Sequence, residues 1–303
     1  MSTTTDEQTH QQTLRRGLLG SSALRPDGIP KVTGDFAFSS DMGAENMLWG
    51  ATLRSPHPYA RILNIDLTAA WKISGVEAIV TADDVPGKST YGLISSDQPV
   101  FARDVVSYMG EPVAAVAADH PETCRRALAA IQINYEVLSP VVDPESAMLV
   151  STAPIHPDGN LIRHQRIISG DTAATGPHVV EGTYVIGMQD QAFLGLEAAL
   201  ALPDPGASGV DLYVATQWLH EDQSQIAACL NLPKDKVRLT LGGVGGAFGA
   251  REDISLQVHC CLLALRTGRP VKMQYGREES FFGHVHRHPA SIWMRHHADP
   301  NGK

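Results

Sequence analysis

Alternating and continuous apolar runs predict several short strands in the first half of the chain. MLWGATLRSPHPYARILNIDL predicts a strand, a turn at residues 55–58 and a second strand. GVEAIVTADDVPG predicts a strand that ends in an aspartate-rich turn. The apolar run GEPVAAVAA is short enough for a buried strand, and INYEVLSPVVD predicts another.

Helical periodicity appears three times along the chain. DHPETCRRALAAI predicts a helix with Pro121 in its first turn, and WLHEDQSQIAACL predicts a second. A third is predicted from the apolar positions after residue 249, and Gly268 and Pro270 end it. Mixed strands and helices in this order predict an α+β protein.

Further strands are predicted in the second half, at about 178–187 and 196–202, and in DLYVATQ and PVKMQYG. In KVRLTLG, the alternation predicts that Val237, Leu239 and Leu241 point inward. Prolines and glycines gather in PESAMLVSTAPIHPDGNL, which predicts a domain boundary. We therefore expect a disordered tail at 1–24 and two domains, at 25–145 and 146–303.

Composition narrows the class of protein. The chain has 303 residues and a net charge of −9, which argues against a nucleic-acid partner because phosphate contacts need clustered Lys and Arg. No apolar run has the roughly 20 residues that a membrane helix needs. The four cysteines form no C-x-x-C pair, so we expect no zinc ribbon or iron–sulfur cluster here, and a cytoplasmic location. Arg15-Arg16 permits a twin-arginine signal, but the apolar run after it is short and broken, which favours the disordered tail.

The segment GGVGGAFGARE, residues 242–252, has five glycines between a predicted strand and a predicted helix. It matches neither the dinucleotide fingerprint G-x-G-x-x-G nor a P-loop. Strand–glycine loop–helix arrangements bind anions through free backbone N–H groups, but a tight structural turn is the alternative.

Three side chains near this loop are candidates for a site. Phe248 is a large apolar residue inside the glycine run, and Glu252 is expected in the first turn of the following helix. Gln217 ends the preceding strand. If the two strands are parallel neighbours, Gln217 and the loop share the carboxyl edge of a sheet, where α/β sheets bind ligands.

These motifs resemble the molybdenum-cofactor subunit of the xanthine dehydrogenase family. GGVGGAFGARE and the TQ before a helix resemble its cofactor loops, and RPDGIPKVTGDFAFSSD, LRSPHPYARI and GEPVAAVAAD resemble its α/β hammerhead domain. QDQAFLGLEAALA resembles the opening of its first molybdopterin-binding domain, particularly in the D subunit of bacterial xanthine dehydrogenases. The resemblance covers nearly the whole chain. It implies an α/β hammerhead domain followed by the first part of a molybdopterin-binding domain.

The resemblance also implies roles for individual residues. Gln217 and Phe248 would lie at the molybdenum, and Phe248 and Glu252 would contact a planar substrate. Gly246, Ala247 and Gly249 would approach the molybdopterin cofactor with their backbone, in a nucleotide form that the sequence does not specify. No catalytic residue is expected in this chain, because the family's general-base glutamate lies in a later region that the chain does not match. We therefore expect a truncated or split subunit that needs a second polypeptide and is inactive alone.

The implied activity is hydroxylation of purines such as hypoxanthine and xanthine. Iron–sulfur and FAD subunits are expected as partners, since the chain has no motif for either group. The alternatives are a fragment of an aldehyde or carbon monoxide dehydrogenase large subunit, or a non-catalytic binding or assembly fragment of the same fold.

Three other groups of residues are weaker candidates for a site. His284, His286 and His288, with His296 and His297, predict either a metal site or a solvated strand, with the strand favoured. Cys261 is expected to pack on an apolar helix face, and Asp83-Asp84 to serve a turn.

Overall fold

The structure is a computed structural model that describes residues 24–156, 158–204, 206 and 208–303. The predicted tail, apart from Leu24, and the alternative at Arg15-Arg16 therefore lie outside the described residues. Residue contacts divide the chain into two units, Met1–Ala37 and Phe38–Lys303. Helix α2 (Gly28–Thr33) belongs to the first unit.

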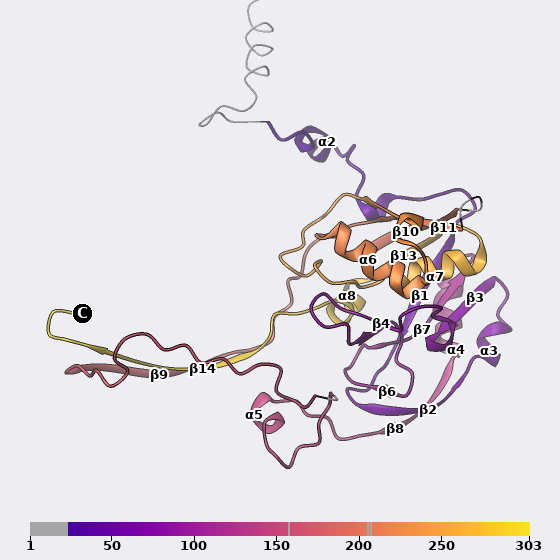
Figure 1. Ribbon diagram of the computed structural model, residues 1–303. Helices are drawn as coiled ribbons and strands as arrows, with labels where there is room; N and C mark the ends of the chain where they lie inside the picture. The colour runs from indigo at the N-terminus through magenta and orange to yellow at the C-terminus, as the bar shows by residue number, and fades with distance from the viewer. Residues whose placement is uncertain (1–23, 157, 205, 207) are drawn as a thin grey trace, which may run out of the picture. The chain divides into compact units, whose positions relative to one another are not determined.

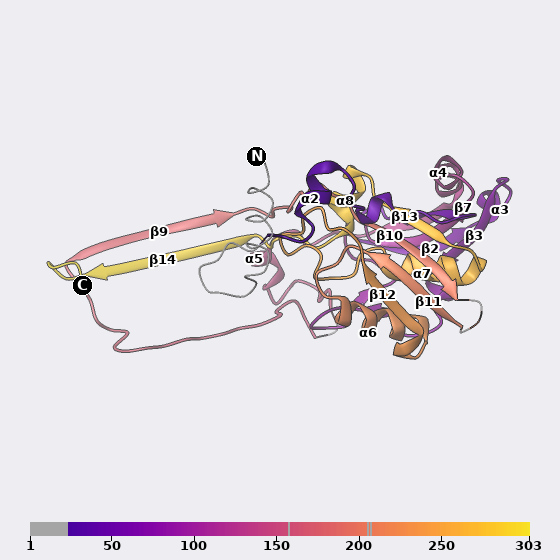
Figure 2. The ribbon, with the colours of Figure 1, turned by 90° about the horizontal axis from the view of Figure 1, so that it is seen from above.

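Seven strands of the second unit form one mixed sheet, in the order β12-β11-β10-β13-β1-β7-β3 (Figure 1, with β12 labelled in Figure 2). β1 is parallel to β13 and β11 is parallel to β12, whereas the other neighbours are antiparallel. The sheet therefore combines strands from both sides of the boundary expected near residue 146, and a division into two domains there stays a prediction. The strands are β1 (Leu48–Arg54), β3 (Val76–Thr81), β7 (Pro112–Ala118), β10 (Ala198–Asp204), β11 (Gly209–Val214), β12 (Val237–Leu241) and β13 (Val271–Gln274).

Strand β7, which lies between β1 and the edge strand β3, explains how helices cover both faces of the sheet. All seven of its residues are buried, as its continuous apolar sequence predicts. Ala115 and Ala117 join one apolar cluster, whereas Ala114 and Val116 join another, because successive side chains point to opposite faces. The first cluster includes residues of α6 (Leu219–Leu230) and α7 (Gln257–Thr267), and the second includes residues of α3 (Thr68–Trp71) and α4 (Pro121–Ala130) (Figure 2).

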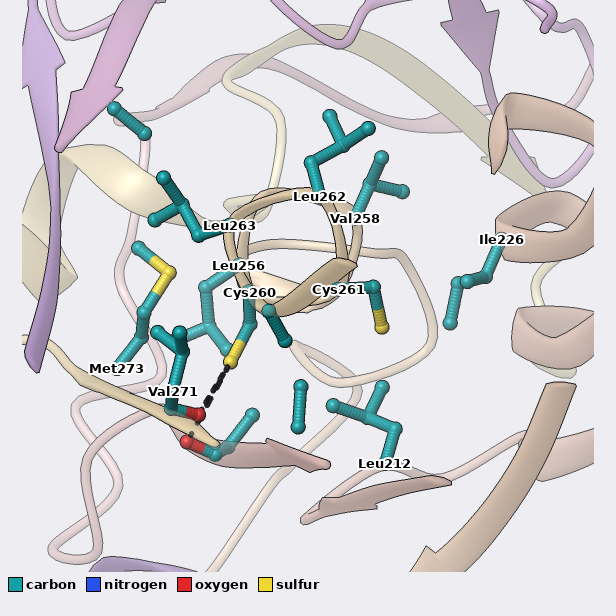
Figure 3. Packing of buried hydrophobic residues seen from close by; sticks show 14 of the residues in the cluster. Leu212, Ile226, Leu256, Val258, Cys260, Cys261, Leu262, Leu263, Val271 and Met273 are labelled. Carbon is teal, nitrogen blue, oxygen red and sulfur yellow. Dashed lines mark hydrogen bonds between the residues drawn. The ribbon is translucent and has the colours of Figure 1, made fainter. Parts of the chain in front are cut away.

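Helix α7 lies against the sheet at the centre of the larger cluster (Figure 3). Its two cysteines are fully buried, and the Cys260 thiol donates to the Val271 carbonyl at 3.2 Å. Cys261 packs among apolar side chains as predicted. Burial raises the pKa of the Cys260 thiol to about 12, so both cysteines act as small apolar residues.

Smaller sheets complete the second unit. β2 pairs with β6 and β8, β4 pairs with β5, and β9 pairs with β14. β1 and β2 thus join different sheets, although the sequence places them on either side of one turn. These elements and the remaining helices are β2 (Ala60–Asp66), β4 (Thr90–Tyr91), β5 (Gln98–Pro99), β6 (Val105–Val106), β8 (Gln132–Val137), β9 (His178–Ile186), β14 (Ala290–Ala298), α5 (Pro144–Ala147), α8 (Arg277–Gly283), and the 3-10 helices η1 (Ser39–Asp41), η2 (Ala82–Asp84) and η3 (Lys234–Lys236).

Several predictions of local structure can be compared with the described residues. Asp83 and Asp84 lie in η2, where the Thr81 N–H donates to Asp84 at 2.9 Å, which confirms their role in a turn. The predicted inward position of Leu241 is wrong: β12 is an edge strand, and Leu241 is 50% exposed. Within the described part of the chain, no helix is long and apolar enough to cross a bilayer.

Candidate functional site

The glycine loop between β12 and α7 packs tightly against another loop of the same chain. A Cβ added to Gly245 would lie 2.7 Å from the Gly195 Cα, a distance that real Cβ atoms essentially never show. The Gly195 N–H donates to the Gly245 carbonyl at 3.0 Å. Part of the glycine run therefore serves close packing between loops, as the structural alternative predicted.

The end of the loop differs, because its backbone is left-handed and open. Gly246, Phe248 and Gly249 have φ values of 109°, 53° and 91°. A Cβ on Gly249 would meet nothing within 4 Å, so its backbone is accessible to a ligand. Phe248 is 76% exposed, and a side chain in this conformation costs about 1–3 kcal/mol. The Phe248 ring is therefore accessible at the end of the loop.

Arg251 stabilises the loop through hydrogen bonds, although no pattern in the sequence identified it. This buried side chain donates to the carbonyls of Gly246 (3.0 Å), Ala215 (3.3 Å) and Gly195. Its guanidinium also lies 4.3 Å from the centroid of the Phe193 ring. The only signal for Arg251 in the sequence was its place two residues after the last glycine of the loop.

Gln217 lies beside the end of this loop, as predicted from parallel neighbouring strands. β11 and β12 pair in parallel, and Gln217 follows the last residue of β11 by three positions. Its backbone N–H donates to the Arg251 carbonyl at 2.9 Å, and its Oε1 accepts from the Arg251 N–H at 3.3 Å. With its oxygen engaged in this way, the Gln217 amide keeps its Nε2 as a donor for another group.

The predicted position of Glu252 in the first turn of a helix is wrong. α7 begins only at Gln257, and residues 251–256 form an irregular segment. The Gln257 side chain accepts from the Ser255 N–H at 2.7 Å, which fixes the chain just before the helix. The glycine loop therefore does not end at a helix N-terminus, and a helix dipole offers no support for an anion there.

Glu252 and Gln217 line different cavities. Glu252 lines a cavity of about 480 Å³ together with Gly249, Tyr91 and Arg54. Gln217 lines another of about 470 Å³ with Trp218 and Leu241, and the two cavities share no lining residue. The structure thus brings Gln217 to the loop end, but it does not bring Gln217 and Glu252 into one cavity.

Charged groups of both signs line the cavity at Glu252. Burial raises the pKa of the Asp253 carboxyl above its ordinary range, and the nearby Glu252 carboxylate acts in the same direction. Arg54 donates to Glu279 at 2.9 Å and to the Gly110 carbonyl at 2.9 Å. A ligand in this cavity would meet a hydrogen-bond donor and carboxylate acceptors.

His284, His286 and His288 do not lie on the favoured solvated strand. His284 and His286 precede β14, and the His284 side chain is only 2% exposed. They lie close to Asp190, which no sequence pattern connected with them, whereas His296 and His297 are exposed on β14.

Comparison with known proteins agrees with this fold. Residues 33–139 match a family model described as the a/b hammerhead domain of aldehyde oxidase and xanthine dehydrogenase, and residues 155–303 match one described as a molybdopterin cofactor-binding domain. Fold and matches together define an α+β protein with a molybdopterin-binding domain. The chain belongs to the xanthine dehydrogenase and aldehyde oxidase family.

Similar relatives include the probable D subunit of a xanthine dehydrogenase from Bacillus subtilis, 36% identical over 93% of this chain and 38% of the relative. The large molybdopterin subunit of nicotinate dehydrogenase from Eubacterium barkeri is 35% identical over 94% of this chain and 68% of its own length. An aldehyde oxidoreductase from Desulfovibrio gigas shares the fold, with a TM-score of 0.84 at 23% identity over 91% of this chain and 32% of that one. The chain thus spans about two fifths of the first relative and about two thirds of the second.

Proposed function

We propose that the chain forms part of the molybdenum site of an enzyme that hydroxylates planar nitrogen heterocycles, with xanthine and hypoxanthine as the expected substrates. The observation that carries the proposal is the pairing of Gln217 with the end of a loop that presents an exposed Phe248 in a left-handed conformation. The names of two relatives support a heterocyclic substrate, since xanthine and nicotinate are both planar nitrogen heterocycles.

The described residues fit the cofactor that the family implies. Gly249 has open space where a side chain would lie, and Gln217 has an amide nitrogen available as a donor. We propose that Gln217, Phe248 and the backbone of Gly246, Ala247 and Gly249 hold the molybdopterin cofactor. When bound, this group supplies the oxidative hydroxylation of an electron-poor carbon.

The remaining proposed steps concern substrate binding. The Phe248 ring would stack on a planar heterocycle, and the Glu252 carboxylate would accept a hydrogen bond from a substrate N–H. The neutral Gln217 amide would donate without competing as a metal ligand. Since no acidic residue of this chain is assigned as general base, we expect no turnover from the chain alone.

Electron transfer away from the site needs other groups. We propose iron–sulfur and FAD subunits as partners, and a further polypeptide segment that supplies the general base, in a cytoplasmic complex. Aldehydes and carbon monoxide are the alternative substrates.

The test compares Glu252→Gln with Glu278→Gln, an exposed glutamate of α8 that does not line the cavity. Both variants are assayed in the assembled enzyme with xanthine, nicotinate and benzaldehyde, at equal molybdenum content. A charged hydrogen bond is worth about 1.5–3 kcal/mol, so kcat/KM for xanthine should fall roughly 10- to 150-fold in Glu252→Gln only. Equal kcat/KM in both variants, or a preference for benzaldehyde, would contradict the proposal.

A further inference from the structure

A cluster of one carboxylate and two imidazoles lies at the base of the β9–β14 pair. The Asp190 Oδ2 is 3.0 Å from the His284 Nε2 and 3.0 Å from the His286 Nε2. One ligand atom from each residue lies within 4.8 Å of the others. The side chains are 16%, 2% and 18% exposed, so the group is largely closed to water.

The backbone brings these residues together from distant parts of the sequence. The Gln189 N–H donates to the Arg287 carbonyl at 3.3 Å, and the Arg287 N–H donates back at 3.0 Å. This bridge fixes Asp190 opposite the segment that carries both histidines. The two imidazole rings stack at 5.1 Å with an angle of 21°, so their Nε2 atoms face the same carboxylate oxygen.

Three polar atoms of the cluster are buried without a hydrogen bond. These atoms are the Asp190 Oδ2 and both ring nitrogens of His284. Each lies within 3.0 Å of another polar atom, but none of these contacts has the geometry of a hydrogen bond among the described residues. Such buried groups each cost free energy unless something satisfies them. A cation between the three ligand atoms would satisfy the Asp190 Oδ2 and the His284 Nε2 together.

Two of the three ligand separations lie near those around a transition metal, and the third is within 4.8 Å. Zinc binds imidazole nitrogen and carboxylate oxygen at about 2.0–2.2 Å, so two ligands of one tetrahedral ion lie roughly 3.3–3.5 Å apart. The observed separations of 3.0 Å require only small shifts to meet this value. Two imidazoles and a carboxylate suit zinc and its neighbours in the first transition row, rather than calcium or magnesium.

A second carboxylate lies behind one of the ligands. The Glu197 Oε1 is 2.7 Å from the His284 Nδ1, and the Glu197 side chain is 4% exposed. Metal-binding histidines usually donate their other ring N–H to a carboxylate, which orients the ring and raises its basicity. Glu197 lies at the right distance for this contact, and a change in the ring orientation would complete the hydrogen bond.

We propose that Asp190, His284 and His286 bind one divalent transition-metal ion, with zinc as the best match, and that Glu197 orients His284. His284 and His286 also line the cavity at Glu252, so a fourth coordination position would face that cavity. The ion would join the end of β9 to the segment before β14. This site involves neither Gln217 nor Phe248, so its metal binding can be tested without the proposed molybdenum function.

The test measures zinc on the untagged full chain after treatment with a chelator. Equilibrium dialysis against zinc chloride, followed by mass-spectrometric metal analysis, should give one saturable equivalent. Asp190→Asn and His286→Gln should lose it, whereas the matched controls His288→Gln and His297→Gln should keep it. Glu197→Gln should weaken binding by about 10- to 100-fold.

Two further readouts separate a lost ligand from a misfolded variant. Circular dichroism should show that His286→Gln, a change at a partly exposed residue, retains the native fold. Zinc should raise the Tm of the original chain and of His297→Gln, but not of His286→Gln. Absence of saturable zinc binding in the original chain, or binding that survives both ligand changes, would overturn the proposal.

Discussion

The backbone N–H of Gln217 donates a 2.9 Å hydrogen bond to the Arg251 carbonyl, and the Arg251 N–H donates to the Gln217 side chain at 3.3 Å. This reciprocal pair joins the segment after β11 to the end of the glycine loop. Because the Gln217 oxygen is engaged by the loop, its amide nitrogen is left to address another group. The loop and Gln217 therefore form one structural unit, and substitutions that loosen the loop should also displace Gln217.

Arg251→Lys should destabilise the chain. Lysine cannot reach all three carbonyls that the guanidinium contacts, and a hydrogen bond to a charged group contributes about 1.5–3 kcal/mol. We expect the free energy of unfolding in urea to fall by about 2–4 kcal/mol. The control Arg238→Lys, at an exposed pair with Asp211, should change it by less than about 0.5 kcal/mol. Equal effects would show that the loop does not depend on Arg251.

Gly245→Ala should also destabilise the chain, because the added methyl group would meet the Gly195 backbone. Overpacking of this kind costs about 1–3 kcal/mol. Gly187→Ala serves as the control, since its Cβ would meet nothing within 4 Å and its φ is not left-handed. Thermal unfolding of the two variants measures the difference, and a Gly245→Ala variant with an unchanged Tm would contradict the packing argument.

Phe248→Gly should stabilise the chain while it impairs the proposed activity. The residue is left-handed and mostly exposed, so glycine relieves roughly 1 kcal/mol of backbone strain and loses little packing. Phe248→Leu keeps the strain and removes the aromatic ring, so stability should be unchanged. In the assembled enzyme, both variants should lower kcat/KM for xanthine. A destabilised Phe248→Gly variant would show that the ring contributes to the fold instead.

Glu111 should make stability depend on pH. Burial raises the pKa of this carboxyl from its ordinary value of 4.5 to about 7, despite hydrogen bonds from Ser107 and Tyr108. Between these two pH values the folded chain holds a proton that the unfolded chain releases, so the free energy of unfolding falls as pH rises. The loss between pH 4.5 and 7 should be about 3 kcal/mol, at about 1.4 kcal/mol per pKa unit.

Glu111→Gln should remove this component, and the control Glu45→Gln, an exposed residue, should keep it. Asp222, whose pKa burial raises to about 6, contributes in the same direction in all three proteins. The comparison is made by urea titration at several pH values. A pH profile of Glu111→Gln that follows the original chain would contradict the assignment.

Local patterns in the sequence predicted most of the elements. Pro121 and the apolar spacing after it predicted α4, and the uniform apolar run at residues 112–118 predicted the buried strand β7. Gln217 was placed near the glycine loop because parallel strands bring their carboxyl ends to one edge.

The errors arose where long-range contacts override a local pattern. Ile254 fits the helical spacing of apolar residues, so the helix was predicted to begin before residue 254. In the structure, the residues before Gln257 form an irregular segment that contacts prevent from becoming helical. The alternating histidines predicted a strand, since alternation is the pattern of a strand face. The contact with Asp190, almost a hundred positions away, is not visible in that local pattern. The local sequence also does not determine which sheet a strand joins: β1 and β2 flank one turn but belong to different sheets.

The pairing of β1 with β13 makes the hammerhead region (33–139) and the molybdopterin-binding region (155–303) depend on each other during folding. Leu48 pairs with Val271 and Gly50 with Met273, so residues more than two hundred positions apart complete the same hydrogen-bond ladder. During synthesis, β1 can pair early with β7, but its other edge stays unpaired until β13 has been made. A chain divided between the two regions would expose a bare strand edge on each piece. The pieces could then regain the native sheet only by adding one strand edge to the other, so coexpression should raise the yield of both pieces.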